Sequence, residues 1–281
     1  APVSRAAQTA TGVASETLRT HDGPVLGLAA SPEGLWTWTA DATFLAGRRM
    51  GPAPPAGAVP LVDGPPVWLL RDGEHVEAVD LEGQRRPTGV AVRELVPDGS
   101  LVLALCGGTL ARLRVRHVGG DRVVVAVPLA TIQPACTVLF RGCAVTAGPH
   151  GTWLHRATAA GVEQVRVRAL DDAVVVDAHS GERATVVVAR RPSGLVRLVV
   201  ADGTVTEAAT DDPTAILVEL PGVLLVQDGG TLHLRDARTP HAPGRSVQAA
   251  LPPGVVAHAG RPTAAEGPAV LTFSLRGPHD A

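Results

Sequence analysis

Short runs of alternating apolar and polar residues, separated by tight turns, recur along the whole chain. Residues 220–236 show the pattern most fully, as LPGVLLVQDGGTLHLRD. Alternation with a period of two is typical of a half-buried β-strand, and an Asp-Gly pair supplies the positive φ angles that a tight hairpin needs. This stretch therefore predicts a β-hairpin.

The same order of elements returns at regular intervals, so the hairpin is one copy of a repeat. Residues 31–49 read SPEGLWTWTADATFLAGRR and residues 96–116 read VPDGSLVLALCGGTLARLRVR. Looser copies begin at Pro65, Gly142, Glu182 and Val255. The turn centres fall near residues 41, 72, 107, 150, 193, 229 and 265. Such a period indicates an array of similar structural units.

Each unit also contains weaker extended runs outside its hairpin, which brings it to about four strands. These runs are 25–30, 89–95, 122–130, 164–170 and 246–251, while the proline-rich residues 52–60 are expected to form a loop. About four short strands per 35 to 43 residues, repeated seven times, predict an all-β fold. We expect a seven-bladed β-propeller of four-stranded antiparallel blades, with residues 1–281 as a single domain. The expected blades are 26–60, 61–95, 96–133, 134–174, 175–215, 216–252 and 253–281.

We expect the segment before the first unit to close the ring of blades. Residues 14–24 are expected to supply the outer strand of the last blade, chiefly through ETLRT at 16–20. Stacking blades in a ring covers both faces of each sheet and leaves only short edges.

Residues 20–45, THDGPVLGLAASPEGLWTWTADATFL, resemble the WD40 repeat. His21 stands at the position of the Gly-His element, and Thr39-Ala40-Asp41 resembles the turn before the third strand. Later units keep less: Val79-Asp80 and LHLRD at 232–236 stand where the family has Trp-Asp. The resemblance implies a degenerate seven-bladed WD40-like ring without the family's regular His–Asp network. The sequence also resembles propellers of bacterial multi-gene systems that contain an ATPase and a von Willebrand-type domain.

Motifs that carry catalytic chemistry are missing from the sequence. It has no Gly-x-Ser-x-Gly elbow, no dinucleotide or phosphate-binding glycine loop and no His-x-x-x-His zinc helix. His150 and His155 are expected on opposite faces of a strand, each solvated or satisfied. The acidic pairs Asp171-Asp172 and Asp211-Asp212 fall at equivalent points of successive units, so we interpret them as loop chemistry rather than metal ligands. No cofactor is expected.

The cysteines and tryptophans also favour structural roles. Cys106, Cys136 and Cys143 are odd in number and lack CxxC spacing, so they are expected to be buried, reduced thiols. Trp36, Trp38 and Trp68 are expected to pack between the first two blades. The alternative is that they anchor a partner at the surface.

Charge and hydropathy limit the classes of ligand that the chain is expected to bind. The formal net charge is -2 and the charges are interspersed, without the basic stripe of a nucleic-acid-binding protein. No apolar run is long enough for a membrane span, and the first residues lack the apolar core of a signal peptide. We therefore expect a cytoplasmic protein with protein partners, and neither nucleic acid nor membrane as ligand.

Two functions from different classes remain open from the sequence. The first is a non-catalytic WD40-like scaffold, a module of a bacterial multi-protein system. The alternative is a propeller enzyme or small-molecule sensor that uses the central channel. For the scaffold, the turns between second and third strands gather the predicted binding residues on one face. These residues are Asp41, Asp72, His150, Ser193 and Asp228.

Overall fold

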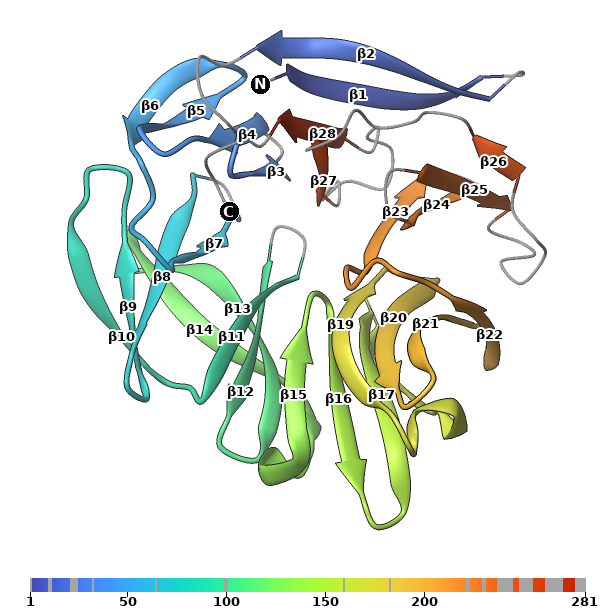
Figure 1. The fold of residues 1–281 in the computed structure, drawn as a ribbon. Coiled ribbons are helices and arrows are strands. Elements are labelled where there is room, and N and C mark those ends of the chain that lie inside the picture. The colour runs from blue at the N-terminus through green and yellow to red at the C-terminus, as the bar shows by residue number, and fades with distance from the viewer. Residues whose placement is uncertain are drawn as a thin grey trace.

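The computed structural model describes residues 2–9, 12–20, 25–31, 33–63, 65–98, 101–158, 160–181, 183–220, 223–228, 231–236, 245–247, 255–260 and 270–275. Within these ranges the regular structure consists of β-strands and two short 3-10 helices, η1 (Pro134–Cys136) and η2 (Arg168–Leu170). Figure 1 shows the strands grouped into sheets around a common centre. His21 and the turn expected between Arg261 and Pro268 lie outside the described residues.

Five four-stranded antiparallel sheets are described with most of their side chains. Sheet 1 contains β3 (Gly27–Ser31), β4 (Gly34–Trp38), β5 (Ala42–Leu45) and β6 (Arg48–Pro52). Sheet 2 contains β7 (Val59–Leu61), β8 (Val67–Asp72), β9 (His75–Val79) and β10 (Arg85–Ala91). Sheet 3 contains β11 (Glu94–Asp98), β12 (Leu101–Cys106), β13 (Thr109–Val118) and β14 (Asp121–Thr131). Sheet 4 contains β15 (Thr137–Phe140), β16 (Cys143–Gly148), β17 (Gly151–Thr158) and β18 (Gly161–Arg166). Sheet 5 contains β19 (Val174–Ser180), β20 (Ala184–Arg191), β21 (Gly194–Ala201) and β22 (Thr204–Ala209).

Two further groups of four paired strands are described mainly by their backbone. Sheet 6 contains β23 (Ile216–Leu220), β24 (Val223–Asp228), β25 (Thr231–Asp236) and β26 (Arg245–Val247). The terminal sheet has the order β2-β1-β28-β27 and joins both ends of the chain. Its strands are β1 (Pro2–Thr9), β2 (Gly12–Thr20), β27 (Val255–Gly260) and β28 (Val270–Leu275).

Strand order within each of sheets 1 to 6 follows the sequence, and the first strand of each sheet lies innermost. Thus β7 lies beside β11, β11 beside β15, β15 beside β19, β19 beside β23, β23 beside β27, and β27 beside β3. Consecutive four-stranded meanders with neighbouring inner strands are blades of a β-propeller. The expected all-β class and four-stranded antiparallel blades are confirmed.

Apolar residues on both faces of the middle strands explain how the sheets stack. In β12, Val102 and Ala104 pack toward sheet 2, whereas Leu103 and Leu105 pack toward sheet 4. Similar clusters join sheet 4 to sheet 5 and sheet 5 to sheet 6. A strand that is covered on both faces needs a continuous apolar run. Residues 101–106 of β12, LVLALC, and residues 184–189 of β20, ATVVVA, have this character.

The three tryptophans of the first two sheets pack as the sequence predicted. Trp36, Trp38 and Trp68 are buried in one cluster between sheets 1 and 2. The rings of Trp38 and Trp68 meet edge to face, with centroids 5.2 Å apart. The Nε1–H of Trp36 donates to Ser31 Oγ at 3.1 Å, which satisfies its buried donor. Their role in core packing is confirmed.

Two local expectations were wrong, and one strand was not expected. The run 164–170 is a strand only to Arg166 and then turns into η2, which carries Leu170 into the core. In the terminal sheet, β2, which contains ETLRT, lies at the outer edge as expected, but β1 was not predicted and lies between β2 and β28. Of the three cysteines only Cys143 is buried; Cys106 is half-buried and Cys136 is exposed on η1.

Candidate functional site

The five residues predicted for partner binding lie in or beside the turns between the second and third strands of their sheets. Asp41 follows β4, Asp72 ends β8, His150 lies between β16 and β17, and Ser193 lies between β20 and β21. All four are exposed. Asp228 ends β24, and its side chain lies outside what the structure describes. These residues therefore belong to five different sheets.

In sheets 2 to 5, the segment that leaves the outer strand returns to the turn between the second and third strands of its own sheet. The residue that follows the fourth strand donates its backbone N–H to a carbonyl in that turn or just after it. The four bonds are Val92 N to Glu74 O at 2.7 Å, Ile132 N to Gly108 O at 2.9 Å, Val167 N to Thr152 O at 3.0 Å and Thr210 N to Leu195 O at 3.1 Å. The turns of sheets 2 to 5 are therefore fixed by their connecting segments. We call this surface of turns and connecting segments the turn face.

Around His150 the turn is held by an ion pair. Arg166 donates from Nε to the His150 carbonyl at 3.1 Å and pairs with Asp171 at 2.7 Å. Asp171 also accepts the Thr152 N–H at 2.9 Å. Hydrogen bonds from the Arg166 side chain and the Thr152 backbone lower the pKa of Asp171. This carboxylate has a structural task, as the interpretation of Asp171-Asp172 as loop chemistry predicted.

The second acidic pair has a similar task in sheet 5. Asp212 accepts hydrogen bonds from the backbone N–H and the hydroxyl of Thr214, at 2.9 and 2.6 Å. Nearby, Arg191 pairs with Glu207 and donates to the Ala169 carbonyl at 2.6 Å. That last bond links the turn of sheet 5 to the segment that leaves sheet 4.

Trp153 is a residue of the turn face that sequence reasoning missed. It lies three residues after His150, on β17, and its exposure is 36%. A Trp at the surface is a frequent energetic anchor of protein interfaces. The signal was available, because Gly-Thr-Trp follows the turn directly, but strand patterning alone does not distinguish a buried from an exposed Trp.

Polar side chains on the inner strands are engaged with the next inner strand. Glu94 Oε2 accepts the Leu139 N–H at 3.3 Å, Asp177 Oδ2 accepts the Ala215 N–H at 2.8 Å, and His179 Nδ1 accepts the Leu217 N–H at 3.1 Å. Arg141 pairs with Asp177 at 2.6 Å. These hydrogen bonds connect neighbouring blades. The acceptor atoms of Glu94, Asp177 and His179 are therefore already engaged with the backbone of the next blade.

His155 differs from the expectation that it is solvated or satisfied. Its exposure is only 6%, and neither ring nitrogen has a hydrogen-bond partner within the described part of the chain. Burial lowers the pKa of this imidazole, because desolvation penalises the charged form. His150, by contrast, is exposed.

The described residues contain no group of three or more His, Cys, Asp or Glu side chains placed to hold a metal ion. No helix among them has the length and apolar character needed to cross a membrane.

Comparison with known proteins adds distant likenesses in fold. No family model and no curated protein matches the chain. Kluyveromyces lactis Hsv2 with its loop 6CD replaced by a Gly-Ser linker aligns over 90% of each chain, with 11% identity and a TM-score of 0.47. The AfRom2 CNH domain covers 92% of this chain and 98% of its own, with 8% identity and a TM-score of 0.43. The Dos1 propeller covers 80% of this chain and 71% of its own, with 13% identity and a TM-score of 0.41. These likenesses are too distant to indicate an activity or a partner.

Proposed function

We propose that this chain is a non-catalytic, WD40-like platform that binds protein partners through its turn face. The observation that carries the proposal is the use of the inner-strand polar groups. Glu94, Asp177 and His179 all accept hydrogen bonds from the next inner strand, which supports a structural rather than a catalytic role for the channel wall. The turn face, in contrast, combines a fixed backbone with exposed side chains.

The proposal includes a closed ring of seven blades. Support comes from the register of the terminal sheet, where β1 pairs with β28 from Val3 opposite Thr272 to Arg5 opposite Val270. Further support comes from β27, which lies beside both β23 and β3. Such pairing would join the two ends of the chain and hold the turns of all blades in one rigid surface.

The test is affinity capture of the tagged protein from a lysate of its source organism, followed by mass spectrometry. Three forms are compared: the wild type, a turn-face variant and a control variant. The turn-face variant carries alanine at Asp41, Asp72, His150, Ser193 and Asp228. The control carries Glu33→Gln and Asp202→Asn, two exposed positions in turns at the opposite end of the sheets.

The expected result is a stoichiometric protein that the wild type and the control retain and the turn-face variant loses. An ATPase or a von Willebrand-type domain protein in that role would support the bacterial, cytoplasmic multi-protein system that the sequence suggests. A partner retained equally by all three forms would contradict the turn face as the binding site. Capture without any protein partner would favour the enzyme or small-molecule sensor instead.

A further inference from the structure

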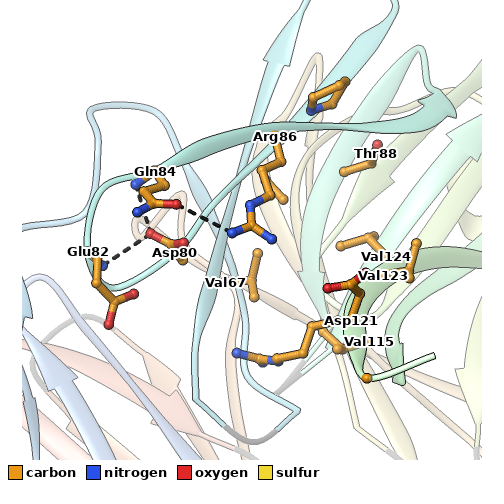
Figure 2. A pocket seen from close by; sticks show the side chains of 14 residues that line it. Val67, Asp80, Glu82, Gln84, Arg86, Thr88, Val115, Asp121, Val123 and Val124 are labelled. Carbon is orange, nitrogen blue, oxygen red and sulfur yellow. Dashed lines mark hydrogen bonds between the residues drawn. The ribbon is translucent and has the colours of Figure 1, made fainter. Parts of the chain in front are cut away.

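A groove lies between sheets 2 and 3, at the opposite end of these sheets from the turn face (Figure 2). It opens beside the turns that join third to fourth strands, since its rim includes Glu82 and Gly120. Its floor is apolar and combines Val67 and Ala78 of sheet 2 with Val124 of sheet 3. The volume is about 520 Å³, within the range of ordinary ligand pockets.

Arg86 reaches into the groove from sheet 2. It stands opposite Ala78 in the ladder of β9 and β10, so the two side chains share the face directed at sheet 3. Figure 2 shows its guanidinium above Val67, beside the turn that carries Gln84. One nitrogen donates to Gln84 Oε1 at 3.3 Å, which holds the side chain over the groove and leaves other donors available.

Arg122 lines the same groove from sheet 3. It lies two residues before Val124 on β14, so by strand alternation both side chains face sheet 2. Its guanidinium donates to the Pro65 carbonyl at 2.6 Å, which fixes its position across the groove from Arg86. Within the described ranges, neither Arg86 nor Arg122 forms an ion pair with a carboxylate.

The acidic residues of the groove do not neutralise these arginines. Asp80 Oδ1 accepts the backbone N–H groups of Glu82 and Gln84, at 3.2 and 2.7 Å, and so stabilises its own turn. Glu82 and Asp121 are exposed at the rim, where water screens them. A groove lined by both positively and negatively charged side chains disfavours a multiply charged phosphate. It suits a ligand that carries N–H donors next to one carboxylate.

We propose that this groove is a second docking site, which binds an extended peptide segment of a partner protein. The segment places an apolar side chain on the valine floor and a neighbouring Asp or Glu between Arg86 and Arg122. The peptide N–H groups meet the rim carboxylates. The groove is separate from the turn face, and peptide binding in the groove does not depend on the turn face.

A random heptapeptide phage library is the probe. It is selected on the immobilised wild-type protein and counter-selected on the Arg86→Gln/Arg122→Gln variant, after both show the same thermal unfolding. Enriched peptides are then synthesised with a fluorescent label and their affinities measured by anisotropy. Arg85→Gln is the matched control, because this neighbour stands opposite Val79 and pairs with Glu77 on the other face of the sheet.

The expected result is a consensus with an acidic residue next to an apolar one. The Arg86→Gln/Arg122→Gln variant should bind the enriched peptides at least about tenfold more weakly, because each arginine contributes a charge-assisted hydrogen bond, and Arg85→Gln should bind like the wild type. No enrichment, a consensus without an acid, or equal binding by the double variant would overturn the proposal. Sedimentation with phosphatidylserine vesicles that depends on both arginines, without any peptide consensus, would assign the groove to a membrane surface instead.

Discussion

Arg112 of β13 and Asp98, the last residue of β11, form a buried ion pair within sheet 3. The Asp98 Oδ2 atom accepts from Arg112 Nε at 2.9 Å, and a terminal nitrogen of the guanidinium lies 2.8 Å from the same oxygen. The exposure of the two side chains is 7% and 2%. Arg112 also donates to the Thr158 carbonyl of sheet 4 at 3.2 Å. One guanidinium thus joins two neighbouring blades.

Loss of one partner of this pair should be costly. Asp98→Ala leaves a buried guanidinium without its carboxylate and is expected to lower the free energy of unfolding by about 3–5 kcal/mol. Urea denaturation measures the change. The control is Glu77→Ala, which breaks the exposed pair of Glu77 and Arg85 and should change stability by less than about 1 kcal/mol. Equal effects of the two substitutions would contradict a structural role for the buried pair.

His155 should make stability depend on pH. Burial lowers the pKa of the folded imidazole below its ordinary value of 6.5. As pH falls through that value, the unfolded chain takes up the proton first, so the free energy of unfolding decreases until the folded pKa is reached. Urea midpoints measured from pH ~8 to ~5 should therefore decline more steeply in the wild type than in His155→Leu. His150→Gln, which alters an exposed imidazole, should keep the wild-type slope; a flat wild-type profile would refute the prediction.

Gly27 should tolerate no side chain. A Cβ at this position would lie 2.4 Å from Cζ2 of Trp38, inside the tryptophan cluster. Gly27→Ala is expected to lower stability by about 1–3 kcal/mol, since overpacking forces the ring from its position. The tryptophan fluorescence should shift with it. Gly148→Ala is the control, because no atom lies within 4 Å of the added methyl. Unchanged stability and fluorescence in Gly27→Ala would disprove the close contact.

Removal of residues 1–20 tests closure of the ring. It deletes β1 and β2 and leaves the edge of β28 without a partner. The melting temperature should fall by several degrees, and a synthetic peptide of residues 1–20 should restore part of the loss. A truncated protein with the wild-type melting temperature would rule out closure by these strands.

Local turn chemistry explains what the sequence predicted well. The hairpin turns at Asp72-Gly73, Gly107-Gly108 and 192–194 lie where glycine marked them, because a positive φ angle is a local requirement. The strands themselves followed from alternation and from valine-rich runs. These signals depend only on residues a few positions apart.

Contacts between distant residues explain what the sequence did not predict. Glu94 meets the backbone of Leu139, and Arg122 meets Pro65, across different blades. The unpartnered His155 was missed for the same reason, since it stands opposite Ala144, whose face of the sheet packs against sheet 3. β1 was missed because PVSRAAQT has one β-branched apolar residue and no clear alternation.

The bond from Val167 N to Thr152 O also has a mechanical consequence. The segment that it anchors continues through η2 into β19, the inner strand of the next sheet. A force applied to the turn at His150 is therefore carried into the neighbouring blade as well as its own. Since the same bond recurs at Val92, Ile132 and Thr210, a load on one turn spreads sideways from blade to blade instead of peeling a single sheet away.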